Sequence, residues 1–186
     1  GSNYGHVASG MCTEETPLKP LTIYGRNKTL AEKVIQDSKN VIIYRFATAF
    51  GISPRLRLDL LVNDFTYQAL RKKYILVYER EHRRSFIHVE DMARALIFAL
   101  ENSKRMVGQT YNVGDESGNM MKEDIVDILK EKLNFVVNFT DTGKDEDQRN
   151  YEVDYTKIKH LGFQAVISLD QGIDEMIKAF KVIDIK

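Results

Sequence analysis

Short apolar runs alternate with amphipathic helical segments along this chain, and no other feature of the sequence restricts its fold more. The run 41–44 (Val-Ile-Ile-Tyr) is typical of a strand buried on both faces of a parallel sheet. Residues 91–102 place Met92, Ala95 and Leu96 on one helical face. Strands alternating with helices predict an α/β fold.

Hydrophobic periodicity also predicts where the elements lie. We expect helices at about residues 24–38, 58–71, 91–102, 122–133, 156–161 and 169–182, and strands at about 41–44, 74–78, 86–89, 110–113 and 135–139. Residues 1–23 contain two of the three prolines and are expected to be loop.

The glycine-rich turn of nucleotide-binding α/β proteins is missing from the sequence. Such folds usually open with a strand, a turn of pattern GxGxxG or GxxxxGK[ST], and a helix. Neither pattern occurs in the 186 residues. The chain therefore corresponds to the back part of an α/β nucleotide-binding fold.

Composition excludes several classes of protein. Lys and Arg total 27 and Asp and Glu total 27, and this balance argues against a nucleic-acid partner. No apolar run approaches the ~18–20 residues that span a bilayer, and nothing resembles a signal peptide. The single cysteine, Cys12, excludes an internal disulfide, and the four histidines lack metal-ligand spacing, so we expect no metal. A cytoplasmic enzyme or small-ligand protein remains.

One tyrosine–lysine pair has a spacing suited to acid–base chemistry. Tyr24 and Lys28 are four residues apart and lie on one face of the expected helix. A neighbouring ammonium stabilises tyrosinate, so such a tyrosine can act as a general acid and base near neutral pH. Tyr155 and Lys159 have the same spacing, and we interpret that second pair as a solvated helix face.

Several further motifs accompany the Tyr24–Lys28 pair along the sequence. They are Tyr4-Gly5, residues 13–20 (TEETPLKP), residues 24–33 (YGRNKTLAEK), residues 44–51 (YRFATAFG), residues 84–93 (RSFIHVEDMA), residues 111–114 (YNVG) and residues 161–163 (LGF). This series resembles the extended short-chain dehydrogenase/reductase family, and in particular its NAD-dependent nucleotide-sugar epimerases and dehydratases. The resemblance runs over nearly all 186 residues.

The resemblance implies a fold and a cofactor site. It implies the back part of a Rossmann-like doubly wound parallel sheet plus a small C-terminal α/β substrate-binding region, lacking the Gly-rich half. Tyr24 would be the catalytic acid/base, and Lys28 would lower its pKa. Both would contact the cofactor, NAD or NADP. The family's catalytic Ser or Thr would lie four residues before Tyr4, ahead of Gly1.

The resemblance also implies substrate contacts. Arg84 would bind the pyrophosphate of a nucleotide sugar, Asn63 its phosphate, and Arg149 would be a second phosphate arginine. Thr48 stands where many epimerases carry Asn. His88 is expected to be structural.

The implied function is an NAD(P)-dependent nucleotide-sugar 4-epimerase that works through a transient 4-keto sugar. Gly1 and Ser2 stand where family dehydratases carry acidic residues, which favours epimerase or ketoreductase chemistry. The alternatives are a 4,6-dehydratase, a 4-keto-sugar reductase and, from another class, a non-catalytic binding module.

The resemblance implies an organisation as well. Residues 1–55 would end the dinucleotide-binding domain, and residues 56–186 would mainly bind substrate, with some segments returning to the Rossmann core. We expect no turnover from this chain without the Gly-rich half, and a homodimer through the helix at 24–38.

Overall fold

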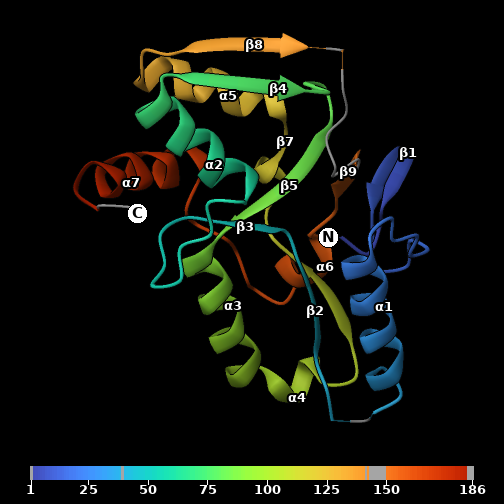
Figure 1. Ribbon diagram of the computed structural model, residues 1–186. Helices are drawn as coiled ribbons and strands as arrows, with labels where there is room; N and C mark the ends of the chain where they lie inside the picture. Colours follow the sequence, from blue (N-terminus) through green and yellow to red (C-terminus); the bar gives the residue numbers. More distant parts are fainter. Residues whose placement is uncertain (1, 39, 141, 143–149, 184–186) are drawn as a thin grey trace.

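A computed structural model describes residues 2–38, 40–140, 142 and 150–183, and it shows the α/β fold that the sequence predicts (Figure 1). The α-helices are α1 (Ile23–Ile35), α2 (Leu61–Tyr67), α3 (Val89–Glu101), α4 (Ser103–Met106), α5 (Lys122–Lys132), α6 (Thr156–Lys159) and α7 (Leu169–Val182). A π-helix, η1 (Gln68–Lys72), continues α2, and a 3-10 turn, η2 (Glu116–Gly118), precedes β7. The strands are β1 (His6–Cys12), β2 (Ile43–Phe46), β3 (Thr48–Phe50), β4 (Tyr74–Tyr78), β5 (Arg83–His88), β6 (Thr110–Val113), β7 (Asn119–Met121), β8 (Val136–Thr140) and β9 (Asn150–Val153).

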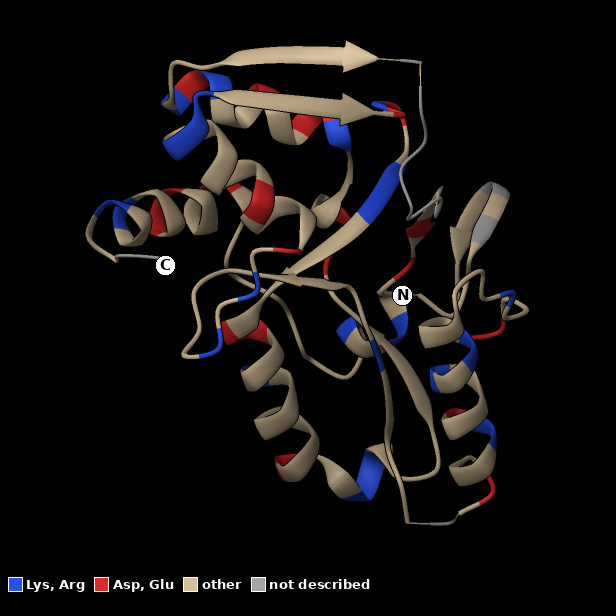
Figure 2. Cartoon of the chain, in the orientation of Figure 1, with Lys and Arg blue, Asp and Glu red and all other residues tan. Residues whose placement is uncertain are grey.

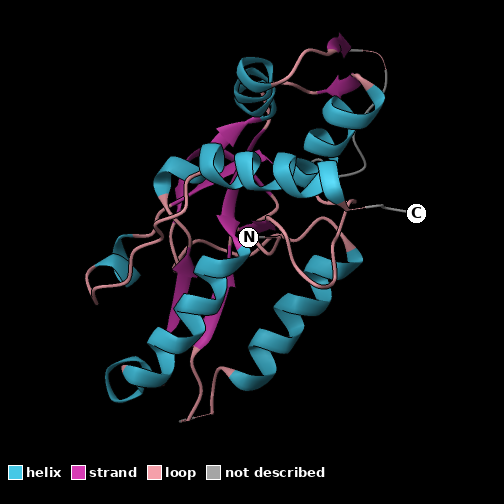
Figure 3. Ribbon diagram, turned by 90° about the vertical axis from the view of Figure 1, so that its left-hand side faces the viewer, coloured by secondary structure: helices cyan, strands magenta, loops and turns pink. Residues whose placement is uncertain are grey.

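Most strand pairs are parallel, as expected for this class. β1 pairs with β9, β2 with β6, β3 with β5 and β4 with β8, all in parallel. β7 runs antiparallel to β5. Figure 3 shows the helices arranged around these central strands. The parallel pairs join segments far apart in the sequence, so helices carry the chain from one strand to the next.

Two hydrophobic clusters stabilise the fold. One cluster joins α2, β4, α5 and α7 and includes the fully buried Ile75, Leu129 and Phe180. The other lies around β2, β6 and α6 and includes Tyr111 and Ile158. Residues after position 55 contribute to both clusters, because the chain returns to the second cluster through β6, β9 and α6.

The structure corrects several element boundaries. Residues 6–12 form β1, where we expected loop, because this segment pairs with β9 some 140 residues later. The strand expected at 41–44 lies at Ile43–Phe46 and continues after Ala47 as β3. The helix expected at 24–38 ends at Ile35. The helix expected at 58–71 begins only at Leu61.

Gly172 explains how α7 approaches the core so closely. A glycine inside a helix costs stability relative to alanine. Here a Cβ at Gly172 would lie 2.4 Å from Cε2 of Phe50, so only glycine fits against that ring. No helix among the described residues has both the length and the apolar character needed to cross a membrane.

Candidate functional site

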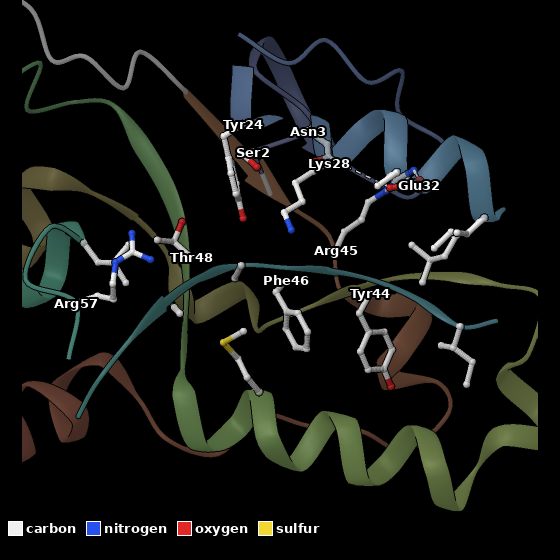
Figure 4. Close-up of a pocket in the computed structure, with 18 residues that line it drawn as sticks. Ser2, Asn3, Tyr24, Lys28, Glu32, Tyr44, Arg45, Phe46, Thr48 and Arg57 are labelled. Carbon is white, nitrogen blue, oxygen red and sulfur yellow. Dashed lines mark hydrogen bonds and ion pairs between the residues drawn. The ribbon is translucent and has the colours of Figure 1, made fainter. Parts of the chain in front are cut away.

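A cavity lies between α1 and the strands β2 and β3 (Figure 4). Its volume is about 680 Å³. Its polar lining residues include Ser2, Asn3, Tyr24, Lys28, Glu32, Arg45, Thr48 and Arg57. Thr48 stands just beyond β2, so the polar end of the cavity is at the carboxyl end of that strand. Ligands of open α/β sheets bind at such strand ends.

Tyr24 and Lys28 project into this cavity side by side from α1 (Figure 4). The Lys28 ammonium lies 5.4 Å from the centroid of the Tyr24 ring. The Tyr24 side chain is exposed (63%), so its phenol is accessible from the cavity. The structure therefore brings together the two groups that the sequence paired by spacing.

Two contacts, a cap at its amino end and a buried ion pair, hold α1 in position beside the cavity. Thr22 caps the amino end of α1, because its hydroxyl accepts a hydrogen bond from the Gly25 amide at 3.0 Å. Further along α1, Glu32 faces β2 and forms a buried ion pair with Arg45. Nε of Arg45 lies 3.1 Å from both carboxylate oxygens. This fork ties α1 to the strand beside the cavity.

A buried polar network extends this ion pair into the core. Arg45 also donates to the Tyr4 hydroxyl at 3.0 Å, and Tyr4 donates to Oδ1 of Asn112 at 2.6 Å. Burial raises the pKa of Tyr4 to about 12, so this phenol stays protonated as a donor at neutral pH. The network joins α1, β2 and β6.

Arg57 is a cavity residue that the sequence reading missed. It lies in the loop between β3 and α2 and pairs with Asp59, whose Oδ1 is 2.7 Å from Nε of Arg57. The hydrogen bond from Arg57 lowers the pKa of Asp59. The basic residues Arg55 and Arg57 in the loop 53–57 (SPRLR), which follows β3, were the available signal.

Asn63 does not line the cavity but shapes the loop that carries Arg57. Its side chain is buried, accepts from the Gly51 amide at 3.0 Å and donates to the Arg57 carbonyl at 3.0 Å. Asn63 therefore holds the Arg57 backbone in place. Its contact with a phosphate stays a prediction.

The other proposed substrate residues lie elsewhere. Arg84 is buried on β5, outside the cavity lining, and donates to the Arg83 carbonyl at 3.1 Å. Arg149 lies outside the described residues.

His88 is buried, caps α3 through Nδ1 and lies 3.1 Å from Glu175 through Nε2. These contacts fit the structural role expected for His88.

The second tyrosine–lysine pair is not a solvated face, and that prediction was wrong. Tyr155 is fully buried, and its hydroxyl bonds with that of Ser85. Burial raises the pKa of Tyr155. Lys159 is paired with Asp115 at 2.7 Å. Tyr155 is buried because its ring packs on Gly114, where a Cβ would lie 2.6 Å from Cζ.

Comparison with known proteins identifies the class. Residues 1–114 match the NAD dependent epimerase/dehydratase family, so the chain belongs to that family. This confirms the resemblance and places NAD as the cofactor of the family. Within the described residues, no group of three or more His, Cys, Asp and Glu side chains could hold a metal ion.

Individual proteins match nearly all of this chain with only part of their own length. The low-salt glycan biosynthesis protein Agl12 of Haloferax volcanii is 28% identical over 94% of this chain and 57% of its own. The solved UDP-glucuronic acid 4-epimerase of Bacillus cereus, in complex with UDP-glucuronic acid and NAD, matches with a TM-score of 0.80 and 24% identity, over 97% of this chain and 59% of that one. The dTDP-glucose 4,6-dehydratase of Bacillus anthracis, in complex with NAD, gives 0.81 and 24% over the same shares. The chain thus spans a little over half the length of these relatives.

Proposed function

We propose that this chain forms the catalytic-helix and substrate-binding part of a nucleotide-sugar 4-epimerase that depends on NAD. The observation that carries the proposal is the side-by-side projection of Tyr24 and Lys28 into one cavity, opposite Thr48 and Arg57. Family membership supports the reaction class. NAD, when bound, supplies a hydride acceptor and donor for the sugar carbon.

In the proposed mechanism, Tyr24 moves the proton. Its phenolate oxygen takes the proton of the sugar 4-hydroxyl as C4 gives up a hydride, and returns that proton to O4 once the 4-keto sugar has turned and the hydride has been added to the opposite face of C4. Lys28 lies one helical turn away, with its ammonium 5.4 Å from the centroid of the Tyr24 ring, and this ammonium can donate to ribose hydroxyls of the cofactor. The Glu32–Arg45 pair keeps the helix, and hence both groups, in place.

Arg57 is the substrate contact that the geometry supports best. Its guanidinium lines the cavity, and Asp59 orients it through a bidentate pair. A fixed guanidinium suits an anionic group, such as a phosphate or a sugar carboxylate. The phosphate contacts proposed for Arg84, Asn63 and Arg149 rest on the family resemblance.

The test is an assay of the intact protein that carries these residues, with NAD and UDP-, GDP- or dTDP-hexoses. Replacing Tyr24 with Phe should lower kcat by about 10²–10⁴-fold, the usual contribution of a positioned acid–base group. Tyr74→Phe is the matched control, because Tyr74 is an exposed tyrosine outside the cavity. Unchanged turnover in Tyr24→Phe would exclude Tyr24 as the acid–base group, and no turnover in the unaltered protein would instead support a non-catalytic binding module.

A second measurement separates epimerase from dehydratase chemistry. In deuterated water, a 4,6-dehydratase incorporates deuterium at C5 of the sugar, whereas a simple 4-epimerase leaves C5 unexchanged. Ser2 in the cavity, in place of an acidic side chain, supports the epimerase. Deuterium at C5 would overturn it.

We also propose a homodimer through α1. Its exposed apolar side chains Ile23, Leu30 and Val34 form a stripe about a third of a turn from the stripe that faces the cavity. An exposed apolar stripe of this kind marks an interface. Sedimentation of the chain with Leu30→Glu should then show a monomer.

The cytoplasmic location expected from the sequence stays a prediction.

A further inference from the structure

Helix α7 packs against the segment that leads into the cavity loop, residues 51–60. Gly172 allows the helix to approach the Phe50 ring, where a Cβ would lie 2.4 Å from Cε2. Glu175 follows three residues later on the same side of the helix. Figure 2 shows that the first half of α7 is acidic. An acidic side chain of α7 therefore lies close to the start of the loop that borders the cavity.

The imidazole of His88 fills the space between α7 and this loop. The residue is 2% exposed, and its ring meets the Phe50 ring edge to face, with 5.3 Å between the centroids. A Cβ at Gly51 would lie 2.4 Å from Nε2 of His88, and a Cβ at Gly172 would lie 3.0 Å from Cδ2. One glycine of the loop and one of the helix thus enclose the ring. The ring cannot shift unless one of these two backbones moves.

Contacts at both ring nitrogens fix the orientation of the imidazole. Nδ1 of His88 accepts a hydrogen bond from the Glu90 amide at 3.3 Å. In a neutral imidazole one nitrogen accepts and the other carries the proton, so this bond places the proton on Nε2. Nε2 lies 3.1 Å from Oε2 of Glu175. A carboxylate at that distance favours the Nε2–H tautomer and holds the ring against Gly51.

Gly51 connects the imidazole to the cavity loop. The Gly51 amide donates to Oδ1 of Asn63 at 3.0 Å. Nδ2 of the same side chain donates to the Arg57 carbonyl at 3.0 Å. Asn63 is buried, so water does not compete for these two bonds. A continuous series of contacts therefore joins α7 to the backbone of Arg57, which lines the cavity.

We propose that His88 and Glu175 are positioning residues for the substrate side of the cavity. Glu175 fixes the imidazole, and the imidazole fixes Gly51. The loop that follows Gly51 then presents the Arg57 guanidinium to an anionic group of the substrate. This inference rests on the proposed function, because that function makes Arg57 a substrate contact.

The acid–base pair belongs to a different part of the cavity. Tyr24 and Lys28 project from α1, which has its own buried ion pair to β2. Loss of the α7 contact should therefore weaken binding of the nucleotide sugar and leave the chemical step intact. In kinetic terms, KM rises while kcat is unchanged. A His88 that only stabilised the fold would lower the amount of active enzyme and leave KM unchanged.

The first test compares Glu175 variants of the intact protein that carries these residues, with saturating NAD and the nucleotide hexose that it turns over. The Glu175 side chain is 48% exposed, so its replacement spares the core. Glu175→Ala should raise KM for the nucleotide sugar about fivefold, as expected for one lost polar contact. Glu175→Gln keeps an oxygen that can accept from Nε2–H and should stay within about twofold of the unaltered protein. Asp174→Ala is the matched control, because Asp174 is also 48% exposed but pairs with Lys132.

The second test needs no turnover. Nitrogen NMR of histidine-labelled protein in mildly alkaline buffer should show His88 neutral, with its proton on Nε2. Glu175→Ala should speed hydrogen exchange of the Gly51 amide about fivefold, because the bond from this amide to Asn63 then opens more easily. Asp174→Ala should leave that exchange rate unchanged.

A variant of His88 tests the imidazole itself. His88→Asn can still cap α3, since asparagine is a preferred capping residue, but it lacks the ring that reaches Gly51. KM should rise at least as much as in Glu175→Ala. The double variant should show no further rise, because both changes break one series of contacts.

The possible outcomes separate this proposal from the proposed function. No turnover in the unaltered protein would contradict the proposed function, and exchange of the Gly51 amide would still decide the positioning role. The proposal is overturned by a proton on Nδ1 of His88, or by a Gly51 amide that does not respond to Glu175→Ala. In an active enzyme it is also overturned by an unchanged KM in Glu175→Ala, by a kcat that falls at constant KM, or by effects that add in the double variant.

Discussion

Helices α3 and α7 have similar lengths and amphipathic sequences, yet the structure buries them very differently. α7 buries six residues, among them Ile173, Met176 and Phe180. α3 buries only Asp91 and Ala95, while Leu96, Ile97 and Leu100 remain exposed. An amphipathic pattern therefore predicts that a helix has a buried face, but not how much of that face the rest of the chain covers.

The two helices are held by different forces. α7 packs its apolar side chains against α2 and the first hydrophobic cluster. α3 packs Met92, Ala95 and Phe98 in the second cluster. It is also anchored by polar contacts: Asp91 accepts from the amides of Val166 and Ile167, and Tyr44 donates to the Ala95 carbonyl. This difference predicts which substitutions each helix tolerates.

The largest effect is expected on α7. Phe180→Ala should lower the free energy of unfolding by about 3–5 kcal/mol, because it leaves a cavity where a fully buried ring packs. Leu100→Ala on α3 should change it by less than about 0.5 kcal/mol. Urea unfolding of both variants measures this contrast. A large loss in Leu100→Ala would show that α3 is already covered in solution.

A smaller effect is expected at the polar anchor of α3. Asp91→Ala should cost about 2–3 kcal/mol, because the amides of Val166 and Ile167 lose their acceptor. Arg94→Ala is the control. Arg94 pairs with Asp91 but is partly exposed, so its loss should cost no more than about 1 kcal/mol. Equal costs in urea unfolding would mean that the ion pair, not the amide contacts, anchors α3.

The smallest effect is expected at the hydrogen bond from the Tyr44 hydroxyl to the Ala95 carbonyl of α3, whose contribution to stability depends on pH. Burial raises the pKa of Tyr44 to about 12, above its unfolded value of about 10. The protonated hydroxyl therefore stabilises the fold fully below pH 10, and this contribution is lost as the pH rises through 12. Tyr44→Phe should cost about 1 kcal/mol at pH 7 and reduce the alkaline loss. Unfolding free energies from pH 8 to 11.5 measure both, and an unchanged pH slope would contradict the assignment.

Hydrophobic periodicity correctly predicted the elements whose formation depends on residues close together in the sequence. The expected helix 169–182 and strand 110–113 coincide with α7 and β6. By contrast, β1 was missed because its pairing with β9 joins residues far apart in the chain. Its sequence, with Gly10 near the middle, has little strand character of its own.

The residues of the candidate site also fall into two groups: those that local spacing predicted and those that depend on distant segments. The spacing of Tyr24 and Lys28 predicted two groups on one helical face, and α1 places them there. Arg57 was not predicted, because it lies in a loop whose course depends on Asn63 and Gly51.

By itself, the sequence determined the α/β class and the pairing of side chains within helices, because these depend on residues a few positions apart, and the order of its motifs indicated the family. Only the tertiary structure decided which of two identically spaced tyrosine–lysine pairs faces a cavity. Tyr155 is buried by Ser85 and Gly114, and Tyr24 is left accessible. Burial depends on what distant segments bring to a side chain, and no local spacing encodes that.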